Sequence, residues 1–172
     1  VPRNPPAVHG RGGVSQKADG AGRASHYYSF TRLTARGELR LDGRRLLVSG
    51  IAWMDHEFGS NQLAEDQIGW DWLGLQLSDG RELMLYLMRK KGGGYDRNSS
   101  GPLIEADGSM RYLPLRAYRF EPAGRWRSSR SGARYPMGWR VSVPGEGIDI
   151  RVRALAKDQE LVTEGSTRVT YW

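Results

Sequence analysis

The feature that most constrains the fold of this chain is a series of short apolar runs separated by tight-turn dipeptides. Asp-Gly stands at residues 42–43, 79–80 and 107–108, and apolar or aromatic residues flank it each time. This dipeptide suits a type I′ hairpin turn, because both central residues of that turn need positive φ. We therefore predict an all-β chain built from antiparallel hairpins.

The expected strands are marked by aromatic and β-branched composition, or by alternation of apolar with polar residues. They cover residues 26–34, 38–41, 45–54, 70–77, 82–88, 102–105, 110–113, 118–120, 125–127, 139–143 and 148–155. A turn at Arg36-Gly37 is expected to end the first of them. Helical character is confined to residues 61–67, and residues 1–24, rich in proline and glycine, are predicted to be irregular.

The predicted strand 82–88 is apolar on both faces. Alternation places Leu83, Leu85 and Leu87 on one face and Met84, Tyr86 and Met88 on the other. Such a strand is covered on both sides, as in a sandwich, or has one face in a packed core and the other in an apolar cavity. The neighbouring strand 70–77 also carries aromatic residues on one face, which favours a barrel with an apolar interior.

The composition of the chain excludes some classes of function. The chain has 172 residues, enough to bury a core, and a net charge of +7. A basic balance permits binding to nucleic acid or to an anionic membrane, but the arginines are scattered along the chain. We therefore expect a solvated basic surface and no nucleic-acid partner. The absence of cysteine excludes disulfides, thiolate metal sites and cysteine nucleophiles.

An acid, an imidazole and a second acid stand side by side at Asp55, His56 and Glu57. Strand alternation predicts Asp55 and Glu57 on one face and His56 on the other. An acid shielded from water beside Trp53 would tend to stay protonated, as a general acid requires. The alternative is structural: a turn cap, a backbone hydrogen bond and an ion pair would occupy the three residues.

The aromatic residues around this cluster allow two interpretations. They could line a pocket for a large apolar ligand, or they could simply fill the core; the residues concerned are Trp53, Trp70, Trp72, Tyr28 and Tyr86. No metal site is predicted, because three adjacent ligands cannot easily converge and only His9 and His26 supply further imidazoles.

The sequence resembles the carotenoid 1,2-hydratase (hydroxyneurosporene synthase) family, a group that includes AttH-like, lipocalin-like proteins. The resemblance runs in order through Ser15 to Lys17, Tyr27-Tyr28-Ser29, residues 50–57, residues 69–80, residues 134–139 and Asp158 to Leu161. It implies an antiparallel, lipocalin-like (calycin-type) β-barrel fold, with parts of two consecutive barrels. Residues 25–60 would belong to the first barrel and the junction, and 61–172 to a second barrel lacking its last strands.

The resemblance also implies an activity. Hydratases of this family use no cofactor, protonate a terminal isoprenoid double bond and let water trap the cation. By position, Asp55 would be the proton donor, with His56 and Glu57 tuning or relaying the proton. The alternatives are a non-catalytic carrier of a hydrophobic ligand and a β-domain with a packed core.

The expected partner is a hydrophobic small molecule. Peripheral membrane association and a periplasmic or membrane-associated location are expected in preference to the cytoplasm. The chain begins with Val1 and not Met, so we expect a mature form or part of a longer protein. A second chain could then supply the missing barrel strands.

Overall fold

The computed structural model describes residues 1–59, 63–163 and 170–172, and these residues confirm the all-β prediction. Two short 3₁₀ turns, η1 (Leu115–Ala117) and η2 (Pro144–Glu146), accompany the strands, and the described residues include no α-helix. No helix among them is long and apolar enough to cross a membrane. The strands are β1 (Ala7–Val8), β2 (Val14–Gln16), β3 (Ala24–Leu41), β4 (Arg44–Phe58), β5 (Gln67–Gln76), β6 (Glu82–Lys90), β7 (Ser100–Ile104), β8 (Met110–Pro114), β9 (Arg119–Ala123), β10 (Trp126–Arg127), β11 (Arg134–Tyr135), β12 (Gly138–Val143), β13 (Ile148–Arg153), β14 (Leu161–Val162) and β15 (Thr170–Tyr171).

The chain forms two compact units, Val1–Leu115 and Arg116–Trp172. The first unit holds two antiparallel sheets: β1-β3-β2 with β4 paired to β3, and β5-β6-β7-β8. The second holds the sheet β13-β12-β9 and two small hairpins, β10–β11 and β14–β15. Residues 25–60 therefore share a unit with residues 63–115, and their assignment to two separate barrels stays a prediction.

The N-terminal segment is more regular than the sequence suggests. The prediction that residues 1–24 are irregular is wrong for β1 and β2, which pair with successive stretches of β3 along the edge opposite β4. Proline and glycine leave two short runs, at 7–8 and 14–16, free to hydrogen-bond to a neighbouring strand. This pairing places His9, which follows β1, and Lys17, which follows β2, next to β3.

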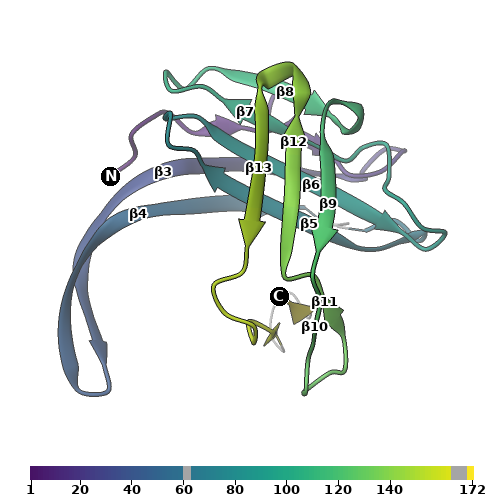
Figure 1. The fold of residues 1–172 in the computed structure, drawn as a ribbon. Helices are drawn as coiled ribbons and strands as arrows, with labels where there is room; N and C mark the ends of the chain where they lie inside the picture. The colour runs from purple at the N-terminus through teal and green to yellow at the C-terminus, as the bar shows by residue number, and fades with distance from the viewer. Residues whose placement is uncertain (60–62, 164–169) are drawn as a thin grey trace. The chain divides into compact units, whose positions relative to one another are not determined.

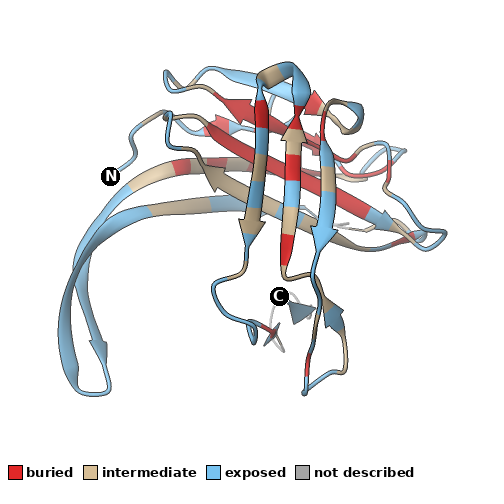
Figure 2. Ribbon diagram, in the orientation of Figure 1, coloured by how far each residue is buried: buried red, intermediate tan, exposed pale blue. Residues whose placement is uncertain are grey.

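β6 is the core of the first unit. Every residue from Glu82 to Met88 is buried, which confirms that both faces of this strand are covered (Figure 2). On one face Met84, Tyr86 and Met88 form a cluster with Tyr27 of β3. Arg32 Nε lies 2.5 Å from Glu82 Oε1, so the buried carboxylate has an ionic partner.

β3 and β4 form a long, curved hairpin whose far end extends away from the rest of the first unit (Figure 1). The expected turn at Arg36-Gly37 is wrong, because β3 runs unbroken to Leu41. Gly37 lies opposite Val48 in the ladder, so it is an ordinary strand residue. The chain reverses at Asp42-Gly43, where φ is 48° and 74°, as a type I′ turn requires.

The other two Asp-Gly hairpins form as predicted but with a different turn. Only the glycines, Gly80 and Gly108, have positive φ. In the predicted helical stretch, Gln67 begins strand β5 and residues 63–66 form a bend and a turn, while 61 and 62 lie outside the described residues.

In the second unit the predicted alternation is confirmed. Val141 and Val143 are buried, and Ile148 begins a strand whose alternate residues are exposed.

Candidate functional site

The predicted acidic cluster lies on β4 with its side chains divided between two faces, as alternation requires. Ser29 pairs with Asp55 in the ladder and Tyr27 pairs with Glu57, so all four side chains share one face. His56 projects from the opposite face, where it stacks on Tyr28 with ring centroids 5.2 Å apart. The structure therefore brings Asp55 and Glu57 together and leaves His56 away from both.

Asp55 accepts two hydrogen bonds at the same oxygen. Trp53 Nε1 donates to Asp55 Oδ1 over 2.9 Å, and Ser29 Oγ donates to the same oxygen. These bonds fix the rotamer of the carboxylate, yet the residue remains exposed. The expectation that Asp55 is shielded from water is therefore wrong for this structure: the carboxylate sits beside aromatic rings without being covered by them.

Behind Asp55 lies a histidine that the sequence did not single out. His9 Nε2 is 2.7 Å from Ser29 Oγ, which makes a continuous chain from His9 through Ser29 to Asp55. Because the hydroxyl of Ser29 donates to a carboxylate, we assign the ring hydrogen of His9 to Nε2. The imidazole is only 2% exposed and lies 4.3 Å from the Tyr27 ring. Burial lowers the pKa of His9 to about 4, so the ring is neutral at pH 7.

An ion pair between the buried Lys17 and the exposed Glu57 forms the second part of the site. Lys17 Nζ lies 2.8 Å from Glu57 Oε1, and Ser25 Oγ donates to the same oxygen over 2.5 Å. The ammonium also lies 4.1 Å from the centre of the Tyr86 ring and 5.1 Å from that of Tyr27. Burial lowers the pKa of Lys17, and the charge of Glu57 opposes that shift.

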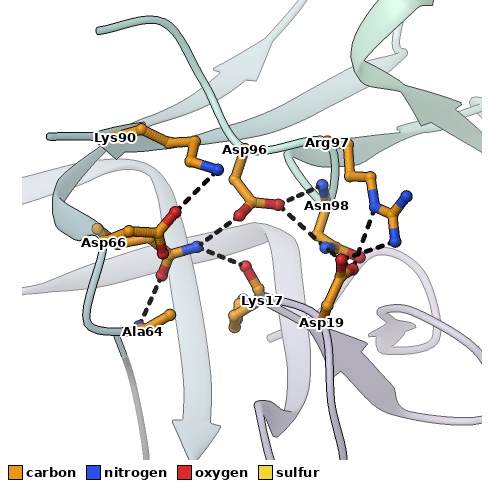
Figure 3. Close-up of polar contacts among 9 residues, drawn as sticks. Lys17, Asp19, Ala64, Asp66, Lys90, Asp96, Arg97 and Asn98 are labelled. Carbon is orange, nitrogen blue, oxygen red and sulfur yellow. Dashed lines mark hydrogen bonds and ion pairs between the residues drawn. The ribbon is translucent and has the colours of Figure 1, made fainter. Parts of the chain in front are cut away.

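A polar network holds the backbone of Lys17 in place (Figure 3). Gln67 Nε2 donates to the carbonyl of Lys17 over 2.9 Å and to Asp96 Oδ2 over 3.2 Å. Asp96 in turn accepts a bond from the backbone N–H of Asn98 over 2.8 Å. Because both Gln67 and Asp96 are buried, these bonds tie the segment after β2 firmly to the second sheet.

The aromatic residues meet on the same face as Asp55. Trp53 and Trp72 contact edge to face at 6.0 Å, and Trp72 Nε1 donates to Tyr27 Oη over 3.1 Å. Trp53 and Trp70 pack against the cluster around Met84 and Tyr86. Burial, followed by the charge of Asp55, raises the pKa of Tyr27. Trp72 is 42% exposed, so one aromatic wall of the site faces solvent.

Of the five aromatic residues predicted to bind substrate, Trp53, Trp70, Trp72 and Tyr86 lie on the side of Asp55. Tyr28 stacks on His56 on the other face.

Reasoning from sequence missed His9, Lys17 and Ser29. Lys17 and Ser29 stand in segments that carry the family resemblance, but neither was given a role in the site, and His9 stands in none of those segments. Among the residues that the structure describes, no group of three or more histidine, aspartate or glutamate side chains could hold a metal ion.

Comparison with known proteins shows the family to which the chain belongs. A sequence profile described as AttH-like matches residues 1–172, the entire chain. The chain belongs to the AttH-like family. A candidate AttH from Nitrosomonas europaea has a crystal structure with a TM-score of 0.89 and 34% identity, and the match covers 100% of this chain and 53% of that one. Comparison with functionally curated proteins gave no match.

Kievitone hydratase from Nectria haematococca is more distant. Its TM-score is 0.74 at 19% identity, and the match covers 97% of this chain and 50% of that one. At this identity the likeness shows the fold alone. The predicted all-β, antiparallel, lipocalin-like fold is thereby confirmed for this AttH-like chain, which spans about half the length of the solved structures it matches.

Proposed function

We propose that this AttH-like protein hydrates or isomerises an apolar, isoprenoid-like alkene, with Asp55 as the group that exchanges a proton with the substrate. The observation that carries the proposal is the position of Asp55: a carboxylate fixed by Trp53 and Ser29 at the edge of an aromatic face. The fold shared with kievitone hydratase supports the reaction class. An acyclic carotenoid is the substrate that the sequence resemblance favours.

The chemistry needs one acid and two aromatic faces. Trp53 and Ser29 both donate to Oδ1, so we assign proton transfer to the other oxygen, Oδ2. In its protonated form, Asp55 gives its proton to the less substituted carbon of the terminal double bond; the π electrons form the new C–H bond and leave a tertiary cation on the more substituted carbon. Trp53 and Trp72 would stabilise the cation through their ring faces. Water then adds to the cation and returns one proton to Asp55, so that the net change is the addition of one water.

The other predicted catalytic residues take different positions in this scheme. Glu57 is bound to Lys17, so it shapes the electrostatic field of the site. His56 faces away from Asp55, and we assign the relay to the chain through Ser29 and His9. The proposal keeps a hydrophobic small molecule as the partner, without cofactor or nucleic acid. Peripheral membrane association, a periplasmic or membrane-associated location and a second chain that completes a barrel remain part of it.

The proposal is tested by incubating the protein with an acyclic carotenoid. Mass spectrometry measures turnover as the gain of one water by the carotenoid. Asp55→Asn removes the transferable proton and should lower turnover roughly 100-fold or more. The matched control is His26→Gln, because His26 is an exposed residue on the opposite face, stacked on Phe58. Turnover that survives unchanged in Asp55→Asn would refute the role of this acid.

The carrier alternative gives a different result in the same preparation. A carrier would be purified with an extractable apolar ligand, and Asp55→Asn would bind that ligand as well as the wild type. Such loading, with no hydration by either protein, would replace the catalytic proposal with a binding one.

A further inference from the structure

A pocket of about 150 Å³ opens beside His9, within the first unit. Its walls include His9 from the segment after β1, Tyr86 from β6, and residues of β1, β7 and β8: Val8, Pro102, Met110 and Tyr112. A cavity of about this volume is large enough for a single six-membered ring. The pocket is therefore much smaller than a carotenoid chain.

The chemistry of the walls favours a neutral occupant. None of the residues that line the pocket is an aspartate, glutamate, lysine or arginine. Lys17, whose ammonium lies 4.1 Å from the centre of the Tyr86 ring, is already paired with Glu57. An ion placed in the pocket would therefore lose its hydration without gaining an unpaired opposite charge, which costs several kcal/mol. The apolar walls match a ring or a short hydrocarbon, as in most small-molecule sites.

His9, one of the residues that line the pocket, has a buried polar atom without a partner. Among buried side-chain nitrogen and oxygen atoms in the described part of the chain, His9 Nδ1 alone has no hydrogen-bond partner. The Tyr86 hydroxyl, by contrast, accepts a bond from Ser100 Oγ over 2.7 Å. Since Nε2 of His9 carries the ring hydrogen, Nδ1 is a bare acceptor, and leaving such an atom buried and unpaired costs about 1 to 3 kcal/mol.

We propose that this pocket binds a small, neutral, ring-sized molecule that carries a hydroxyl group, and that His9 Nδ1 accepts the hydrogen bond of that hydroxyl. The apolar walls supply affinity and the imidazole supplies selectivity for a donor. The site is separate from the exposed aromatic face beside Asp55, although Ser29 connects the two. The inference does not rest on the proposed hydratase activity, because it is tested by binding.

The experiment uses phenol and toluene, which have the same size, and the charged ring compound benzoate as probes. Titration of the protein, followed by calorimetry and by the ¹⁵N resonances of His9, should show saturable binding of phenol with a shift of the Nδ1 signal. Toluene lacks the donor and should bind roughly fivefold more weakly, in line with one hydrogen bond. Benzoate should not bind. Met110→Trp fills the rim and should abolish phenol binding, whereas Leu155→Trp, at a fully exposed position of the second unit, should not.

Several outcomes would overturn the proposal. Equal affinity for phenol and toluene would show an apolar cavity without a role for His9. A His9 Nδ1 signal that is hydrogen-bonded from the start and unmoved by phenol would show that water alone occupies the pocket. His9→Phe should erase the preference for phenol over toluene, and should this variant fail to fold, the resonances of the wild type still decide the question.

Discussion

At the scale of single residues, the most unusual group is His9. A histidine that is buried and neutral destabilises the folded chain whenever solution conditions favour its charged form. Here the ring is held by Ser29 on one side and by the Tyr27 ring on another, with no carboxylate in direct contact. The Ser29 hydroxyl separates it from Asp55, so the acid and the imidazole act on each other through one intervening group.

This arrangement predicts a pH dependence of stability. The pKa of His9 is about 4 in the folded chain and 6.5 in the unfolded chain, so between these values the unfolded chain binds more protons. The stability that depends on neutral His9 is therefore fully present above pH 6.5 and is lost as the pH falls toward 4. The loss attributable to His9 is roughly 3 kcal/mol, at 1.36 kcal/mol per pKa unit.

Urea unfolding of the wild type and of His9→Gln at pH 7 and pH 4.5 measures this contribution. Carboxylates titrate in both proteins, so the difference between the two pH profiles isolates His9. Glutamine keeps an N–H for Ser29 but does not titrate, and its profile should be flatter. Parallel profiles for the two proteins would contradict the buried, neutral state of this imidazole.

At the scale of elements, β6 and the far half of the β3–β4 hairpin differ most in how far their side chains are buried. β6 is a central strand, hydrogen-bonded on both sides by β5 and β7, and is buried along most of its length. The far half of the hairpin, residues 34–51, is a two-stranded ribbon with exposed faces. Pairing places Leu39 opposite Leu46 on one face and Arg40 opposite Arg45 on the other, so the ribbon is amphipathic.

Replacing a leucine by alanine should therefore lower the free energy of unfolding by very different amounts in the two elements. Leu85 is 0% exposed, and Leu85→Ala leaves a cavity that should lower the free energy of unfolding by about 2 to 5 kcal/mol. Leu47 is 82% exposed on the ribbon, and Leu47→Ala should change it by less than about 0.5 kcal/mol. Denaturant unfolding compares the two, and similar losses would show that Leu47 is covered in solution.

At the scale of the whole molecule, local stability should follow the distribution of burial. Backbone amides exchange with solvent through local opening, which is rarest where apolar contacts are densest. We expect the slowest hydrogen exchange in β6 and β7 and the fastest strand exchange in residues 36–49. β3 supplies an internal comparison, because residues 24–31 alternate between buried and less buried positions while 34–41 are exposed. Uniform protection along β3 would contradict this gradient.

The sequence alone was sufficient for most of the strands, for the positions of the Asp-Gly hairpins and for the division of Asp55 and Glu57 from His56. These features depend on a two-residue period and on turn preferences, which act between neighbours in the chain. The false turn at Arg36-Gly37 has the same origin: glycine signals a reversal locally, but pairing with Val48 keeps the strand extended.

Tertiary structure alone decided the composition of the site. His9 and Ser29 are 20 residues apart, and Ser29 and Asp55 are 26 apart. They meet only because β1 and β4 add to the two edges of β3 in particular registers, and no local pattern encodes such a register. The exposure of Asp55 and the burial of Lys17 were equally undetermined by the sequence, since burial depends on how distant strands pack and not on the residues beside them.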